Sequence, residues 1–356
     1  MARRKSSNAS SFMKAARREE IEALCKRAFG RIPDRVAFPG GRSRSAFMAE
    51  IGDERFVLAK RDSPGDATIE GIVMKVLSRT GLVPRVIRVV DEWVVQELVD
   101  GVRLPVYLDG LETVHERQAA LDLALSSLAE LQTFAHAENL HHRVPRVGPD
   151  RDWSDGNLMR ARKISEIVDI APPLLDYGKL ETLFTLDPRE FVKADARPGN
   201  ALVCDGRIVW FDWEGCGRRH SLDDLAFVLS DEWTAIDPET ESRLIDKHLA
   251  SFARKRSETE AFDYLMAFGV FHMMARMHRA IRYRYRDGEW WSREKCLHND
   301  KIGVTPTEVG LMCDRARRWS LRVTPLHTLA PWCENLMEKL DLALPDLGTL
   351  QKRRAG

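Results

Sequence analysis

The residue types that could carry out chemistry are concentrated in the segment KADARPGN, residues 193–200. Asp195 lies inside this segment, Asn200 ends it, and a second carboxylate, Asp212, follows Asn200 by twelve residues. A carboxylate can accept a proton, and the oxygens of Asn and Asp are hard ligands of the kind that Mg²⁺ prefers. These three residues could therefore supply one proton acceptor and two ligands for a metal ion that carries a phosphate.

The sequence between Asn200 and Asp212 predicts the element that brings them together. Two β-prone runs, ALVC and RIVWF, are joined by Asp205-Gly206, which is a typical two-residue hairpin turn. Counting back from this turn places Asn200 opposite Phe211, so Asn200 and Asp212 meet at the open end. Opposed residues have Cα atoms about 4.5–5.5 Å apart, so both side chains could reach one cation. For the segment taken alone, an ordinary hairpin with solvated polar ends remains the alternative.

Length and composition limit the class of protein. With 356 residues, 44% hydrophobic and 31% charged, the chain is long enough for two lobes with a substantial core. No apolar run approaches the ~20 residues that span a bilayer, and the basic N-terminus lacks the apolar stretch of a secretory signal. Six scattered cysteines favour free thiols, so we expect a cytoplasmic protein. The net charge of +1 does not favour a nucleic-acid partner, and the oligomeric state stays open.

The pattern of predicted elements changes once along the chain. Residues 1–29 are predicted to form a polar tail and an appended helix, and residues 30–100 a small sheet with one helix. Residues 101–356 are predicted to be mostly long helices, with one clear hairpin at Asp205. A β-rich first lobe and a helical second lobe put the expected cleft at their junction.

A glycine-containing turn in the first lobe is a weak signal for phosphate binding. Gly40, Gly41 and Ser43 lie between two predicted strands, where glycines let backbone amides approach an anion. Basic turns of this composition are more often only turns. The turn therefore indicates a phosphate site only in combination with other residues of the chain.

Lys60 and Glu70 are a second weak signal in this lobe. Lys60 closes the next strand, and the alternation of side chains puts it on the same face as Leu58. Glu70 opens the helix after that strand, where an acid could cross the lobe and pair with Lys60. A strand-end lysine is usually solvated, and an acid in a first helical turn also stabilises the helix by itself. Arg61 is a rival for the role of Lys60, because the strand register is inferred.

The order of these signals is more specific than any one of them. With its glycine turn, strand lysine, helix glutamate and residues 193–200, the sequence resembles the aminoglycoside phosphotransferase and choline kinase superfamily. The family signature His-Gly-Asp-x-His-x-x-Asn is followed, after a hairpin, by Ile-Asp-Trp-Glu; this chain has FDWE at residues 211–214. Asp224 also matches a family aspartate that braces the catalytic loop. The resemblance covers roughly residues 30–235 and implies an α+β, two-lobed protein-kinase-like fold, with a small β-rich N-lobe and a larger helical C-lobe.

This resemblance implies a role for each candidate residue. Asp195 would orient and deprotonate an acceptor hydroxyl, while Asn200 and Asp212 would hold Mg²⁺ on the phosphates of ATP. The strand lysine would contact the α- and β-phosphates, held by the helix glutamate, and the interlobe backbone would bind adenine. The nucleotide-binding residues that it implies are Gly40, Gly41, Ser43, Lys60, Glu70, Glu97, Leu98 and Val99.

The segment departs from the family signature at two positions. Lys193 stands where the family has histidine, and Arg197 stands where it often has another. Lys193 could supply a different hydrogen bond to the loop or point toward an anionic substrate. Both residues are counted with Asp195 as candidate catalytic residues.

The second lobe carries a basic and aromatic segment whose role stays open. Arginines recur at helical spacing from Arg276 to Arg286, with Trp290 and Trp291 close by. A solvated basic face is the usual fate of such a stripe, but part of it could bind an anionic or aromatic acceptor. Acids such as Asp231, Glu232 and Asp237 could instead create a negative pocket.

The sequence therefore predicts an ATP- and Mg²⁺-dependent kinase that phosphorylates a hydroxyl of a small molecule, with Asp195 as the base. The alternative is a nucleotide-binding pseudokinase or regulatory protein that engages a macromolecule through the basic helix. A protein kinase is a third possibility, but no segment resembles an activation loop with its closing Ala-Pro-Glu motif. The identity of the acceptor is not encoded in any motif that we find.

Overall fold

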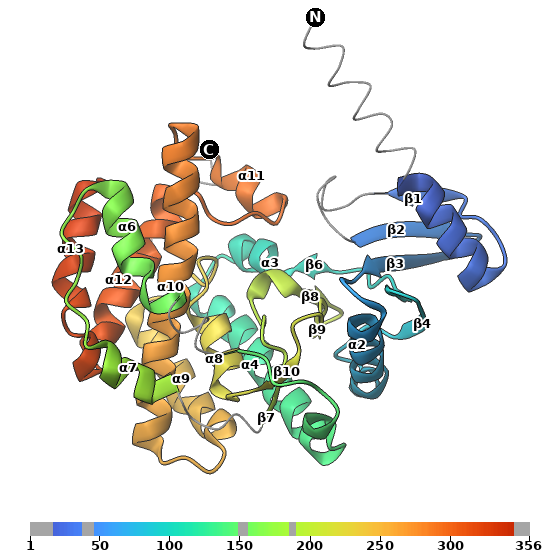
Figure 1. Ribbon diagram of the computed structural model, residues 1–356, viewed down its shortest axis with the longest axis horizontal. Helices are drawn as coiled ribbons and strands as arrows, with labels where there is room; N and C mark the ends of the chain where they lie inside the picture. The colour runs from blue at the N-terminus through green and yellow to red at the C-terminus, as the bar shows by residue number, and fades with distance from the viewer. Residues whose placement is uncertain (1–16, 38–45, 149–155, 185–189, 345–356) are drawn as a thin grey trace, which may run out of the picture. The chain divides into compact units, whose positions relative to one another are not determined.

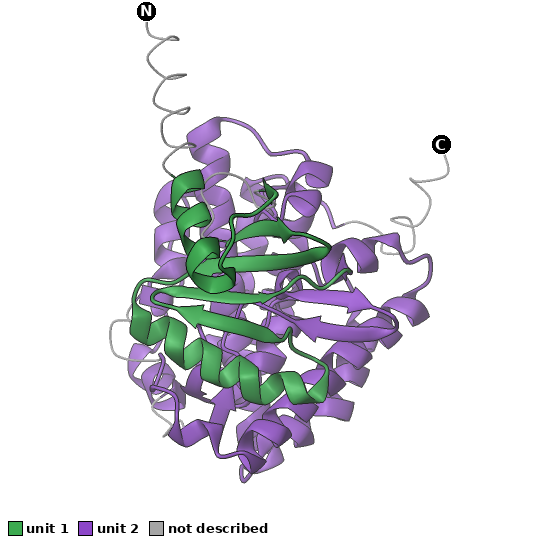
Figure 2. Ribbon diagram, turned by 90° about the vertical axis from the view of Figure 1, so that its right-hand side faces the viewer, with its two compact units in different colours: residues 1–100 green, residues 101–356 purple. Residues whose placement is uncertain are grey.

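The structure is a computed structural model that describes residues 17–37, 46–148, 156–184 and 190–344 (Figure 1). The chain divides into two compact units, Met1–Asp100 and Gly101–Gly356, which Figure 2 shows in two colours. The predicted glycine turn with Gly40, Gly41 and Ser43 lies outside the described residues.

Unit 1 is built on a five-stranded antiparallel sheet in the order β1-β2-β3-β5-β4. Its strands are β1 (Arg35–Ala37), β2 (Ala46–Ile51), β3 (Glu54–Lys60), β4 (Val86–Val90) and β5 (Trp93–Glu97). The helix α2 (Pro64–Leu77) begins after Ser63, whose hydroxyl accepts a hydrogen bond from the amide of Asp66 at 3.2 Å. The prediction of a small sheet with one helix between its strands is confirmed.

Two helices cover the two faces of this sheet. The helical residues 17–29 bury Ile21 and Leu24 in one cluster with Phe56, Leu58 and Trp93. The opposite face presents the buried Ala59 and Val94, and α2 packs against β4 and β5 there. Because successive side chains of a strand point to opposite faces, neighbouring residues of β3 meet different helices.

Unit 2 is mainly helical, as predicted. Its longer helices are α4 (Val114–Ala137), α6 (Arg160–Val168), α7 (Tyr177–Phe184), α8 (Leu222–Leu229), α9 (Pro238–Ala253), α10 (Glu258–Asp287), α12 (Pro306–Ser320) and α13 (Leu329–Lys339). The predicted elements did not include two short helices and three short strands, which are α3 (Leu104–Gly110), α11 (Arg293–His298), β6 (Val102–Arg103), β7 (Glu190–Val192) and β10 (Gly217–Arg219).

The helix α10 is the centre of this unit (Figure 1). It packs against α6, α8 and α12, and residues such as Leu265, Met273 and Ile281 are fully buried. Ser257 and Glu260 form a capping box at its start, and Gly288 ends it with a left-handed φ of 79°. Among the helices of the described residues, none is long and apolar enough to cross a membrane.

The predicted hairpin is present with the predicted register. The strands β8 (Ala201–Cys204) and β9 (Arg207–Trp210) pair Cys204 with Arg207 around the Asp-Gly turn. At the open end, the amide of Phe211 donates to the carbonyl of Asn200 at 3.0 Å. The two-residue turn therefore fixes the strand register, which brings Asn200 next to Phe211 and Asp212 at the open end of the hairpin.

Candidate active site

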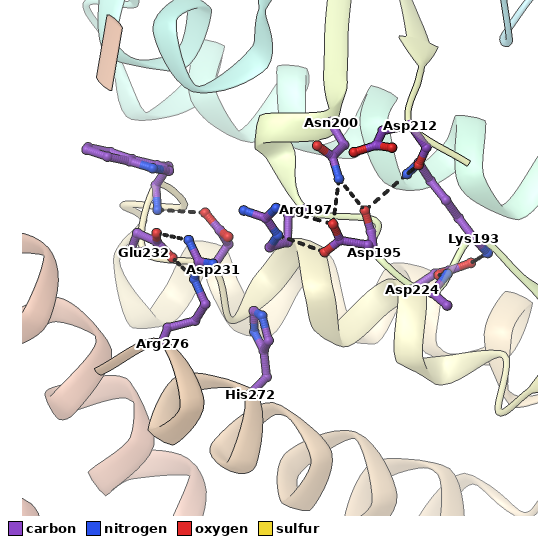
Figure 3. Close-up of polar contacts among 12 residues, drawn as sticks. Lys193, Asp195, Arg197, Asn200, Asp212, Asp224, Asp231, Glu232, His272 and Arg276 are labelled. Atoms are coloured by element: carbon purple, nitrogen blue, oxygen red, sulfur yellow. Dashed lines mark hydrogen bonds and ion pairs between the residues drawn. The ribbon is translucent and has the colours of Figure 1, made fainter. Parts of the chain in front are cut away.

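The carboxylate of Asp195 is held by two side chains of its own loop. Asn200 Nδ2 donates to Asp195 Oδ2 at 2.8 Å and to the Asp195 carbonyl at 3.0 Å. Arg197 Nε donates to Oδ1 at 2.7 Å, and Nη2 donates to Oδ2 at 3.2 Å (Figure 3). The short 3₁₀ turn Pro198–Asn200 brings the amide back to the carboxylate. The candidate base is thus fixed in one orientation.

The surroundings of Asp195 keep its carboxylate ionised. Burial alone would raise its pKa, but the charge and the hydrogen bonds of Arg197, with a smaller effect of Lys193, hold that pKa well below its usual range. The same ion pair raises the pKa of Arg197. Asp195 is therefore a weak base while Arg197 is bound to it.

Lys193 is a fully buried lysine at the centre of the site. Its Nζ donates to the carbonyl of Asp195 at 3.1 Å and to the carbonyl of Asp212 at 2.6 Å, and it lies 5.4 Å from the ring centroid of Trp213. Burial lowers the pKa of Lys193, and the negative charges of Asp195, Asp212 and Asp224 act against this. The side chain joins the loop of Asp195 to the segment after the hairpin.

Asp224 braces the loop from α8, as the resemblance implied. Its Oδ2 accepts from the amide of Lys193 at 3.0 Å and from Gln132 Nε2 at 2.9 Å, and its Oδ1 accepts from the amide of Ala194 at 2.9 Å. Ala194 has a φ of 65° and Asp212 a φ of 59°, in the left-handed region that is unfavourable for residues other than glycine. Asp224 and Lys193 hold the backbone next to both strained residues.

Asn200 and Asp212 provide two neighbouring side chains with oxygen atoms, which a magnesium site requires. Figure 3 shows the carboxylate of Asp212 beside the amide of Asn200, at the open end of the hairpin. Because Asn200 Nδ2 faces Asp195, its amide oxygen is turned the other way. Mg²⁺ is usually bound by one or two carboxylate or amide oxygens, and it keeps waters and phosphate oxygens as its other ligands. The donor set therefore fits this ion when it arrives with a nucleotide.

The expected ion pair between Lys60 and Glu70 is wrong. Glu70 is buried on α2 and binds Arg61, with Arg61 Nη2 donating to Glu70 Oε1 at 2.7 Å and Nε donating to Oε2. Lys60 instead forms an ion pair with Glu20 of the helical residues 17–29 and another, at 3.5 Å, with Glu92.

Strand alternation explains this correction. Lys60 shares the face of Leu58, and residues 17–29 cover that face, so its nearest acid belongs to them. The next residue, Arg61, turns to the face that α2 covers. The alternation of side chains correctly put Lys60 on the same face of β3 as Leu58. The error was to expect Glu70 of α2 to reach that face as well. The buried glutamate identifies Arg61 as the cation of the predicted pair.

The backbone predicted to bind adenine is partly engaged inside unit 1. The amide of Glu97 donates to the carbonyl of Arg85 at 3.0 Å, and the amide of Leu98 donates to the carbonyl of Arg55 at 3.2 Å. The Glu97 carboxylate binds the side chain of Arg85 at 2.7 Å. The amides of Glu97 and Leu98 are therefore already used within unit 1.

A second charged cluster lies beside Arg197. Arg276 of α10 donates to the carboxylate of the buried Glu232 at 2.8 Å, and this pairing lowers the pKa of Glu232 against the effect of burial. Asp231 is also buried; burial and the charge of Glu232 raise its pKa to about 7. The carboxylate of Asp231 points toward Arg197 in Figure 3, and His272 lies below it.

Two residues of the site were not predicted from the sequence. Gln132 of α4 donates to Asp224 from far away in the sequence, and no local pattern marks it. Asp231 was considered only as one of several acids, although it begins the charged cluster just after α8 ends. Nothing in the sequence Asp231-Glu232 indicates that Glu232 pairs with an arginine while the pKa of Asp231 is raised.

Comparisons with known proteins agree with this architecture at the level of the fold. A scan against models of protein families finds no match, and a search of curated proteins finds none. Among solved structures, the amicoumacin kinase hAmiN in complex with AMP-PNP, Ca²⁺ and Ami shares 13% identity at a TM-score of 0.51, covering 77% of this chain and 90% of that one.

A second solved structure is similar over more of the chain. It is a thermostable mutant of the aminoglycoside phosphotransferase APH(4)-Ia in a ternary complex with ADP and hygromycin B, with 13% identity, a TM-score of 0.50 and coverage of 85% of this chain and 98% of that one. Identities this low show the fold alone. The predicted α+β, two-lobed protein-kinase-like fold is confirmed.

Proposed function

We propose that this chain is an ATP-dependent phosphotransferase that moves the γ-phosphate to a hydroxyl group of a small molecule. The observation that carries the proposal is the group of Asp195, Asn200 and Asp212 at the open end of the hairpin. The kinase-like fold, shared with an amicoumacin kinase and an aminoglycoside phosphotransferase, adds support. Such an enzyme would work in the cytoplasm, where ATP is supplied.

Asp195 is suited to orienting the acceptor hydroxyl. A carboxylate offers about four acceptor positions. From the residues that the structure describes, Asp195 Oδ2 receives two hydrogen bonds and Oδ1 receives one, from Arg197. Oδ1 therefore keeps a position for the hydroxyl proton even while Arg197 is bound. Phosphoryl transfer passes through a loose transition state, so a weak base that takes the proton late is sufficient.

Asn200 and Asp212 would hold Mg²⁺ through their side-chain oxygens. When bound, this ion supplies positive charge to the phosphates of ATP. The chain's own contribution is to keep the two ligands in register, through the hairpin and through the bond from Lys193 to the Asp212 carbonyl. Lys193 thus has a positioning role, which argues against an inactive site at this departure from the family signature.

In unit 1, Arg61 is the better candidate for contacting the α- and β-phosphates. Its guanidinium is fixed by Glu70, and a guanidinium can bind phosphate oxygens as well as a carboxylate. Lys60, which the sequence favoured, is engaged by Glu20 and Glu92. The carbonyls of Glu97 and Leu98 and the amide of Val99 would bind adenine.

The test is ATP turnover with Mg²⁺ across a library of hydroxylated metabolites. Asp212→Asn is the blank, because it removes a charged ligand with little change in shape. Asp205→Asn, at the exposed hairpin turn, is the matched control. We expect ADP formation that depends on one class of alcohol, persists in the control and is lost in the blank. A blank as active as the wild type, or no turnover with any alcohol, would contradict the proposal.

A further inference from the structure

One side of α10 carries four polar or charged residues, two of which contact the segment after α8. His272, Arg276, Arg279 and Tyr283 are separated by four, three and four positions, so they lie along one side of the helix. His272 Nδ1 lies 2.9 Å from the hydroxyl of Ser230, and Arg276 binds Glu232. This side of the helix, which we call the basic stripe, therefore faces the segment after α8.

An aromatic pair closes the far end of the basic stripe. The rings of Tyr283 and Trp291 stack with centroids 5.2 Å apart. The amide of Trp291 donates to the carbonyl of Val304 at 2.7 Å, and the amide of Gly303 donates to Glu232 at 3.3 Å. The loop that carries Trp291 is thus tied to the acid that holds Arg276. The aromatic pair and the charged cluster border the same region.

The electrostatic coupling places this region next to the proposed base. The charge of Arg276 contributes to the low pKa of Asp195, after the larger effects of burial, Arg197 and Lys193. Arg279 is exposed along part of its length; the partial burial of the rest, followed by the charge of Arg276 and a smaller effect of Arg197, lowers its pKa. Arg279 follows Arg276 by about one turn of α10, so it lies next to the helix position that binds Glu232.

The acids that could attract a cationic acceptor are already engaged. Glu232 is bound to Arg276, and Asp237 caps α9, accepting from the amide of Thr240 at 2.9 Å. Asp231 is buried, and its raised pKa of about 7 leaves it partly neutral. The negative pocket that these three acids could form is therefore weak.

One arginine of the basic stripe is not neutralised by an acid of the described residues. Arg279 is exposed and forms no ion pair with any of the residues that the structure describes. Lys301 Nζ lies 5.5 Å from the ring centroid of Trp291, and the guanidinium of Arg286, held by Asp287, lies 4.5 Å from that of Tyr283. Along α10, Arg279 therefore lies between the ion pair of Arg276 with Glu232 and the stacked ring of Tyr283.

We propose that the acceptor alcohol carries an anionic group, a carboxylate or a phosphate, which Arg279 binds while its hydroxyl reaches Asp195. This inference rests on the proposed phosphotransferase function and names the class of its acceptor. A guanidinium recognises either anion through paired hydrogen bonds, and the Tyr283 and Trp291 rings would support the rest of the molecule. Arg279, which has no ion pair among the described residues, would therefore select acceptors that carry a negative charge.

The test uses four small alcohols with one carbon skeleton: glycerol, glycerate, glycerol phosphate and aminopropanediol. Each is added to the full chain with Mg²⁺ and ADP, and the shift in Tm is measured; turnover is then measured with ATP. The variants are Arg279→Gln, Arg279→Lys, and Arg284→Gln as the matched control, since Arg284 stacks on Trp290 on another side of α10.

We expect the two anions to raise Tm more than glycerol or the amine does, and comparison of glycerate with glycerol phosphate identifies the preferred anion. Arg279→Gln should weaken the binding of the anions roughly tenfold or more, Arg279→Lys should restore part of it, and Arg284→Gln should leave it unchanged. Equal shifts in the wild type and Arg279→Gln, a preference for the amine, or no anion-dependent shift would overturn the inference. Anion binding without any turnover would instead contradict the proposed kinase function.

Discussion

The ammonium of Lys193 donates a 2.6 Å hydrogen bond to the backbone carbonyl of Asp212. The same ammonium donates to the carbonyl of Asp195, so one buried side chain joins the proposed base to a proposed metal ligand. In the family signature a histidine occupies this position. Lys193 is longer than histidine, and its one ammonium reaches the carbonyl oxygens of both Asp195 and Asp212.

Replacing Lys193 by Met should therefore reduce both stability and activity. Two hydrogen bonds from a charged donor are lost, each worth about 1.5–3 kcal/mol, so we expect a loss of several kcal/mol in the free energy of unfolding, measured with urea. The turnover rate should fall by a larger factor than the KM for ATP rises, because Asp195 and Asp212 are no longer held in fixed positions relative to each other. Lys193→His should recover part of the rate; a methionine variant as active and as stable as the wild type would contradict this role.

Arg197→Gln should change the pH dependence of turnover. Arg197 keeps the pKa of Asp195 well below its usual range, and Asp195 must be ionised to accept a proton. Without the guanidinium the pKa rises, so activity is lost at a higher pH on the acid side. Profiles of kcat between pH 4 and 8, each normalised to its own maximum, show this shift. Arg207→Gln, on the exposed hairpin, is the control, and coincident profiles for all three proteins would contradict the role of Arg197.

Arg61 and Lys60 should differ in their effect on nucleotide binding. We expect Arg61→Met to raise the KM for ATP by roughly tenfold or more, since a charged hydrogen bond is worth about 1.5–3 kcal/mol. Lys60→Met removes the ion pairs with Glu20 and Glu92 and should change that KM much less. Initial rates at varied ATP concentration distinguish the two. A large effect of Lys60→Met with a small effect of Arg61→Met would restore the assignment that the sequence favoured.

The difference between Arg61 and Lys60 illustrates what the sequence determines. Local rules predicted the hairpin around Asp205 and hence the meeting of Asn200 and Asp212, because turn chemistry and strand alternation act over a few residues. The helix before residue 30 was predicted, but which helix covers which face of a sheet depends on packing between distant segments, so the contact of residues 17–29 with Lys60 was not predictable.

The charged cluster was hidden from the sequence for the same reason. Glu232 and Arg276 are far apart in the sequence, and whether an arginine of α10 is buried or solvated depends on what packs against it. Helical spacing correctly predicted that Arg276 and Arg279 share a side of the helix. It could not show that Glu232 neutralises Arg276 and leaves Arg279 without an ion pair among the described residues.

Asp231 should make the protein less stable as the pH rises. Burial, with the charge of Glu232, raises its pKa to about 7, whereas in the unfolded chain it ionises near ~3.9. Between those values the folded state holds a proton that the unfolded state has released, so the free energy of unfolding falls as pH increases through this window. Asp231→Asn removes this contribution, and urea unfolding from pH 5 to 8 should show a flatter dependence. Asp205→Asn is the control; a slope for Asp231→Asn equal to the wild type would contradict the assignment.

The most direct measurement of the central claim is the transfer of labelled γ-phosphate from ATP to a pool of hydroxylated metabolites, by the wild type and by Asp195→Asn. The substitution keeps the shape of the side chain but removes its ability to take a proton, so the fold should survive and can be checked by its Tm. We predict a labelled product with the wild type and a loss of at least roughly a hundredfold in the variant. A folded Asp195→Asn protein that transfers phosphate at the wild-type rate would contradict the account.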